Sequence, residues 1–82
     1  MTVKEFNNAV REFGDHVYRF ILRSIKDSHR ADDIVQDTYE KLWNCVTEIE
    51  YGAVKSWLFT TAYNRMIDVI RKDSRLVDVD HY

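Results

Sequence analysis

Apolar residues recur every three to four positions in three segments of the chain, which is the spacing of an amphipathic α-helix. The pattern predicts helices over residues 3–26, 30–47 and 53–72. Their apolar faces comprise Val3, Phe6, Val10, Phe13, Val17, Phe20 and Ile21 in the first segment, Ala31, Val35, Thr38, Leu42, Val46 and Ile49 in the second, and Leu58, Phe59, Ala62, Met66, Val69 and Ile70 in the third. Three such helices with short connections predict an all-α, compact three-helix bundle.

The residues that flank these segments fit helix ends. Thr2 and Glu5 have the spacing of a capping box, in which each side chain satisfies a free amide at the helix start. Asp27 or Ser28 is expected to cap the second helix, and Gly52 is expected in the loop before the third. The apolar period weakens after residue 72, so the tail is predicted to fray.

Composition narrows the class of protein. A chain of 82 residues with 45% hydrophobic residues indicates one folded domain. Gly14 interrupts the first helix at a cost of about 1 kcal/mol relative to Ala, so a bend is expected there. Cys45 is the only cysteine, so no internal disulfide or cysteine-rich zinc site is expected. We expect neither a secretory leader nor a membrane span, which together with the lone cysteine favours the cytoplasm.

Charge is segregated along the chain. The formal net charge of −2 argues against a nucleic-acid partner when it is taken alone. Residues 27–52, however, hold seven acids and two bases, whereas residues 53–76 hold five bases and two acids. An acidic helix followed by a basic helix predicts two partners of opposite charge.

The second helix carries a polar stripe on its outer face. The stripe comprises Asp33, Gln36, Asp37, Glu40 and Asn44. Trp43 lies at the border between this stripe and the apolar face, and a tryptophan in such a place is often a protein contact. The alternative is a solvated acidic face beside a half-buried tryptophan, and the residues alone leave both interpretations open.

The third helix carries an outward line of a different kind. It comprises Trp57, Thr61, Asn64, Asp68, Arg71 and Arg75, flanked by Arg65 and Lys72. An exposed aromatic ring among cations, amides and hydroxyls suits single-stranded nucleic acid, because rings stack on bases and cations bind phosphates. In the alternative, Trp57 packs inside the bundle and the basic residues only solubilise the surface.

Two segments resemble a known family. Residues 31–43 read ADDIVQDTYEKLW and residues 56–72 read SWLFTTAYNRMIDVIRK. Together they resemble region 2 of bacterial sigma factors, in the extracytoplasmic-function (ECF) branch of the sigma-70 family. Tyr39 stands where the family usually has Phe, and Thr61 stands where it usually has Ile. The resemblance covers essentially the whole chain.

The resemblance implies a role for each outer face. The second helix would bind a coiled coil of the β′ subunit of core RNA polymerase. The third helix would capture the non-template strand of the −10 promoter element, with a flipped base held between Asn64 and the loop over residues 47–55. Polymerase-binding residues would be Asp33, Gln36, Asp37, Glu40 and Trp43. DNA-binding residues would be Arg65, Arg71, Lys72 and Arg75 at phosphates, and Trp57 and Thr61 at the upstream duplex edge.

The resemblance also bears on domains and partners. Residues 1–76 would form the region 2 domain, and residues 77–82 would begin a linker to a domain that reads the −35 element and is absent from this chain. An anti-sigma protein is a further partner of such factors. No cofactor is implied.

Rival interpretations are weaker. Asp32, Asp33 and Asp37 have the spacing DDxxxD, which differs from the DDxxD of magnesium-dependent prenyl-diphosphate enzymes, and no second motif exists, so no enzyme is expected. The histidines lack partners that would indicate a metal site or a catalytic relay; they are His16, His29 and His81. One alternative function stays open, a helical module that binds only polymerase or an anti-sigma protein and no DNA.

Overall fold

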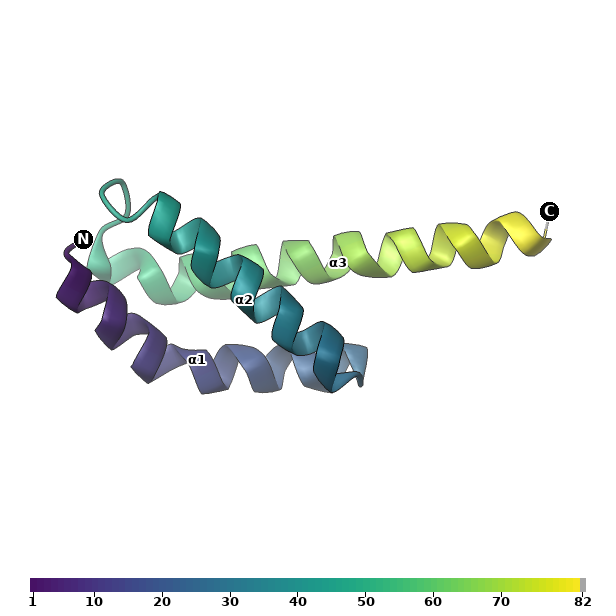
Figure 1. The fold of residues 1–82 in the computed structure, drawn as a ribbon, viewed down its shortest axis with the longest axis horizontal. Coiled ribbons are helices and arrows are strands. Elements are labelled where there is room, and N and C mark those ends of the chain that lie inside the picture. The colour runs from purple at the N-terminus through teal and green to yellow at the C-terminus, as the bar shows by residue number, and fades with distance from the viewer. Residues whose placement is uncertain (82) are drawn as a thin grey trace.

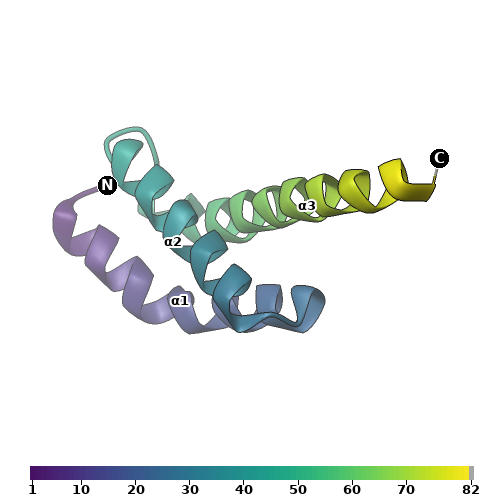
Figure 2. The same ribbon diagram turned by 45° about the vertical axis from the view of Figure 1, so that its right-hand side comes forward.

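The computed structural model describes the backbone of residues 1–81 and the side chains of residues 1–72. It contains α1 (Val3–Ile25), α2 (Ser28–Asn44), a short 3₁₀ turn η1 (Tyr51–Ala53) and α3 (Val54–His81). Successive helices run in opposite directions, and the far end of α3 projects beyond the other two (Figures 1 and 2). Each helix packs against both others. The predicted all-α three-helix bundle is confirmed.

The caps of the first two helices follow from local sequence. The Glu5 amide donates to Thr2 Oγ1 at 3.1 Å and the Thr2 amide donates to Glu5 Oε1 at 2.9 Å, which is the predicted capping box. Asp27 caps α2 by accepting hydrogen bonds from the amides of His29 and Arg30. Because Asp27 is the cap, α2 begins two residues before the predicted start at residue 30.

The second helix ends at Asn44, three residues before the predicted end. The amide of Cys45 still donates to carbonyls of the last turn, and the chain then leaves the helix. The Met1 ammonium donates to the carbonyl oxygens of Val46 at 2.6 Å and Ile49 at 2.9 Å. This cation satisfies carbonyls that a continuing helix would have paired, so the turn after α2 is tied to the start of α1.

The third helix continues to His81, so the predicted end at residue 72 is wrong, while the predicted fraying of the tail stays a prediction. No Gly or Pro follows Gly52, so nothing in the sequence breaks the helix. The loss of apolar periodicity after residue 72 therefore does not mark the end of the helical backbone. The backbone of residues 77–81 is therefore helical, and the domain boundary at residue 76 stays a prediction.

The core is built mainly from the predicted faces. Val17 and Ile21 of α1, Leu42 of α2 and Leu58 and Ala62 of α3 are completely or almost completely buried. Pattern reading missed three small or medium apolar residues that are also buried, and it included two that are exposed. The missed residues are Ala9, Ile34 and Val54, and the exposed ones are Val3 and Ile70.

Gly14 has a packing role that the sequence did not indicate. It is buried in α1, and the Tyr39 hydroxyl of α2 lies so close to it that a Cβ at this position would overlap the hydroxyl oxygen. Burial, followed by the carboxylates of Asp15 and Asp32, raises the pKa of Tyr39 above its ordinary value of 10.0. The glycine therefore permits the close approach of α1 and α2. The ribbon of α1 also bends near its middle (Figures 1 and 2).

No helix within the described residues combines the length and the hydrophobicity that a membrane span requires.

Candidate functional site

The stripe on α2 lies on the outside of the bundle, as predicted. We call it the acidic surface; it comprises Asp33, Gln36, Asp37, Glu40, Asn44 and the bordering Trp43. All of these residues are exposed except Asp37, which is half-buried. The Trp43 side chain is 48% exposed, and its ring meets the ring of Phe6 edge-on with centroids 5.1 Å apart. The acidic surface therefore offers carboxylates, amides and one apolar ring to a partner.

The predicted line on α3 is only partly exposed. Asn64, Arg71 and Lys72 are exposed, whereas Thr61 is half-buried. Trp57 is half-buried and packs against the core, so its predicted outward position is wrong. The spacing placed Trp57 away from the apolar face of its own helix, but part of its side chain is buried against the core. The Arg75 side chain lies outside the described residues.

Arg65 of α3 connects the groove side of α3 to the acidic surface of α2, two faces that the sequence pattern described separately. Its Nε lies 3.1 Å from Asp37 Oδ2 on α2, and its Nη1 lies 3.2 Å from Asp68 Oδ2 on α3. Lys72 Nζ also approaches Asp68 Oδ2, at 3.5 Å. The Arg65 and Asp37 side chains are 33% and 44% exposed, so this pair contributes about 0–1 kcal/mol to stability. The pair is thus weak enough for a charged ligand to compete with it.

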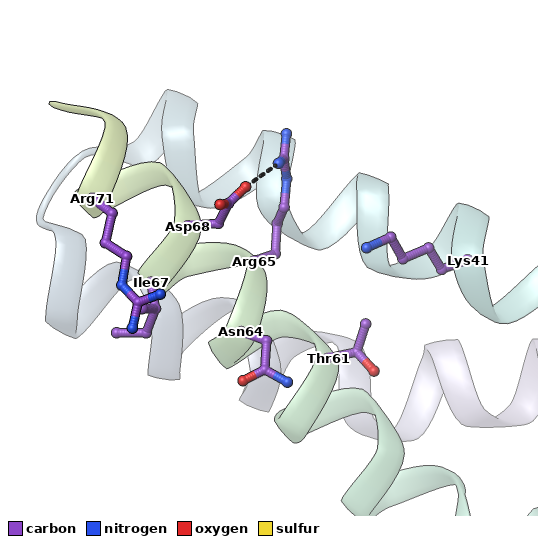
Figure 3. A pocket seen from close by; sticks show the side chains of 7 residues that line it. All are labelled: Lys41, Thr61, Asn64, Arg65, Ile67, Asp68 and Arg71. Carbon is purple, nitrogen blue, oxygen red and sulfur yellow. Dashed lines mark hydrogen bonds and ion pairs between the residues drawn. The ribbon is translucent and has the colours of Figure 1, made fainter. Parts of the chain in front are cut away.

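An open groove of about 470 Å³ lies between α2 and α3 (Figure 3). Its lining comes from α3 through Thr61, Asn64, Arg65, Ile67, Asp68 and Arg71, and from α2 through Lys41. Figure 3 shows Lys41 at one end of the groove and Arg71, beside Ile67, at the other. The groove contains three cations against one carboxylate, that of Asp68, together with an amide and a hydroxyl, and this set suits noncovalent binding of an anionic chain.

Sequence reasoning missed Lys41. Its side chain is exposed and also lines a smaller depression with Asp37, Glu40, Asn44 and Arg65. The period of α2 gives the direction of Lys41 around its own axis but not the helix that lies beside it. One signal was available, since Lys41 is one of only two bases among residues 27–52.

The turn between α2 and α3 is held against α1. Besides the Met1 contacts, the Tyr51 hydroxyl donates to Glu12 Oε2 at 3.4 Å. Burial and then the Glu12 carboxylate raise the pKa of Tyr51 above 10.0. No residue of this turn lines the groove that contains Asn64. The structure therefore does not bring Asn64 and the loop over residues 47–55 together in that groove.

Within the described part of the chain, no group of three or more His, Cys, Asp or Glu residues is arranged to hold a metal ion. Cys45 is half-buried and free.

Comparison with known proteins identifies the family. Residues 9–76 match Sigma-70 region 2. The chain belongs to this family. It is 34% identical over 79 residues to the ECF RNA polymerase sigma factor SigM of Bacillus subtilis, covering 96% of this chain and 47% of that protein. The resemblance to region 2 of ECF sigma factors, stated from residues 31–43 and 56–72, is confirmed.

Two further relatives are less identical to this chain in sequence and match fewer of its residues. The ECF RNA polymerase sigma factor SigE of Mycolicibacterium smegmatis is 28% identical over 71 residues, covering 87% of this chain and 28% of that protein. The ECF RNA polymerase sigma factor SigK of Mycobacterium tuberculosis is 30% identical over 69 residues, covering 77% of this chain and 37% of that protein. The chain thus spans about half or less of the length of these relatives. No solved structure matches it.

Proposed function

We propose that this chain acts in transcription initiation as the part of an ECF sigma factor that binds core RNA polymerase and captures one promoter strand. One observation carries the proposal: a sigma-70 region 2 chain presents an acidic surface on α2 beside a cation-lined groove on α3. Ligands of opposite charge would therefore bind on adjacent helices. The partners are core polymerase, promoter DNA and, in its regulation, an anti-sigma protein.

The acidic surface is the proposed polymerase site. Asp33, Gln36 and Glu40 are exposed, so they are available to a basic coiled coil of the β′ subunit. Complementary charge steers the encounter and fixes the orientation of the two helical elements. Trp43 adds a large exposed ring at the edge of this surface, and such rings often dominate the binding energy of protein interfaces.

The groove on α3 is the proposed site for the non-template strand of the −10 element. Asn64 would bind a base edge, while Arg65 and Arg71 would bind phosphates, with Lys72 beside them. Melting needs no ATP in this scheme. Binding only the unpaired strand shifts the duplex equilibrium by the binding free energy itself, and extruding a base costs a few kcal/mol.

Trp57 would not act as a ring that is free to stack on a base. Since it packs against the core, its exposed edge would meet the upstream duplex while its buried part supports α3. Thr61, half-buried one turn away, lies in the groove and would contact the same stretch of DNA.

A salt titration of binding to a −10-like single strand tests this proposal. The 82-residue chain should bind a fluorescent oligonucleotide at low salt, with an affinity that falls linearly on a log–log plot as salt rises. Asn64→Ala should weaken binding to the preferred sequence more than to a scrambled strand. Unmeasurable binding at low salt, or no effect of Asn64→Ala, would favour the alternative of a protein-interaction module without DNA recognition.

A further inference from the structure

Lys41 belongs to α2, the helix that carries the acidic surface, but its side chain lines the groove along α3. It is exposed, it lines the groove together with Asn64, Arg65 and Arg71, and Figure 3 shows its ammonium directed toward the side of α3 that carries Arg65. Its neighbour Glu40 belongs to the acidic surface. The groove is therefore built by α2 and α3, although the charge pattern of the sequence placed its cations on α3 alone.

The cations of the groove differ in their availability. Arg65 is held by Asp37 and Asp68. Lys41 and Arg71 have no ion pair with any residue in the described part of the chain. The two unpaired cations stand at opposite ends of the groove, with Asn64 and Arg65 between them (Figure 3). A polyanion that follows the groove would meet an unpaired cation at each end.

We propose that Lys41 binds a backbone phosphate of the same single strand that α3 captures. This inference rests on the proposed function and extends its DNA site from α3 onto α2. A polyanion is the favoured occupant because the partner of the acidic surface must attract carboxylates, and a lysine repels such a basic partner. The ammonium is also directed into a groove that contains a base-binding amide and two arginines.

The position of Lys41 also limits the DNA path. The smaller depression that Lys41 also lines contains Asp37, Glu40, Asn44 and Arg65. Phosphates that extended into it would meet the Glu40 carboxylate, and Arg65 there is already paired with Asp37. Lys41 therefore marks the edge of the strand on the polymerase side, so the two ligands occupy adjoining areas without overlapping.

The test is a salt titration of single-strand binding by Lys41→Gln, read by fluorescence anisotropy of a labelled −10-like oligonucleotide. Loss of one phosphate contact should reduce the slope of log affinity against log salt by about 0.7. Lys41→Arg should retain the slope. The matched control is Lys4→Gln, which removes an equal charge from an exposed lysine of α1 outside the groove and should leave the slope unchanged.

Each outcome decides the inference. A reduced slope in Lys41→Gln alone supports it. An unchanged slope in Lys41→Gln, with normal binding by the unaltered chain, overturns the Lys41 assignment and leaves the proposed function standing. If Lys41→Gln and Lys4→Gln reduce the salt slope by the same amount, the change reflects only the lower net charge of the protein. That result would also overturn the Lys41 assignment. An unaltered chain that binds no strand overturns both proposals. Loss of polymerase retention with unchanged DNA binding would place Lys41 in the polymerase interface instead.

Discussion

The outer faces of α2 and α3 are both polar, yet they are built differently. The acidic surface follows mainly from α2, because its residues lie outward at helical spacing; two of its members also touch another helix, Asp37 through its ion pair with Arg65 and Trp43 through its ring contact with Phe6. The groove on α3 depends on neighbours: α2 supplies Lys41, Asp37 holds Arg65, and Trp57 is partly covered. The first surface is thus largely a property of one helix, whereas the second is a property of the packed bundle.

The two tryptophans give the largest expected difference between these regions. Trp57→Ala should lower the free energy of unfolding by about 2–3 kcal/mol, below the range for a fully buried ring because Trp57 is half-buried. Trp43→Ala should lower it by less than about 1 kcal/mol, because this ring is 48% exposed. Urea denaturation followed by circular dichroism measures both. Equal losses would mean that the two rings have equal structural roles and that the faces of α2 and α3 do not differ in this respect.

The contact between Gly14 and Tyr39 should give the next largest effect. Gly14→Ala should destabilise the bundle by about 1–2 kcal/mol, because the new methyl group meets the Tyr39 hydroxyl and forces α2 or the ring to shift. In a Tyr39→Phe background the same change should be neutral or stabilising, since the hydroxyl is gone and Ala favours the helix by about 1 kcal/mol.

A double-mutant cycle in thermal or urea denaturation tests this contact. The double mutant should have a higher free energy of unfolding than the sum of the two single-mutant effects predicts. Additive effects of the two substitutions would show that the close approach of Tyr39 to Gly14 does not hold α1 against α2.

Asp37→Asn should change the binding of both ligands in opposite directions. It removes a carboxylate from the acidic surface, so polymerase retention should fall. It also removes one of the two carboxylates that hold Arg65, so single-strand affinity should rise by about two- to threefold, in keeping with a partly exposed pair of about 0–1 kcal/mol.

Asp68→Asn is the matched control for this effect. It removes the other carboxylate that holds Arg65 but lies on α3, so it should strengthen single-strand binding without affecting polymerase retention. If neither substitution changes single-strand affinity, Arg65 is not a DNA contact that the aspartates restrain.

The contrast between the surfaces explains what the sequence could predict. Helical period and caps predicted α1 and α2 closely, because Thr2, Glu5 and Asp27 act within one turn of the chain. The acidic surface followed from the same period. The pairing of Arg65 with Asp37 and the place of Lys41 depend on the packing of α2 against α3, and the partial burial of Trp57 depends on the core, none of which a one-helix projection contains. The length of α3 was missed because its apolar pattern stops after residue 72, although no Gly or Pro breaks the helix there.

If α2 and α3 carry separate surfaces for two ligands, the binding of both ligands should respond differently to one substitution on each surface. Asp33→Arg changes an exposed residue of the acidic surface, and Arg71→Gln changes an exposed residue at the far end of the groove. Polymerase retention and single-strand affinity would be measured for each, after circular dichroism has shown unchanged helical content.

The account predicts that Asp33→Arg reduces polymerase retention by about tenfold, equivalent to about 1.4 kcal/mol, with single-strand binding unchanged or slightly stronger. Arg71→Gln should weaken single-strand binding and leave polymerase retention intact. If each variant instead loses both ligands to the same extent, α2 and α3 form one undivided interface and the account is wrong.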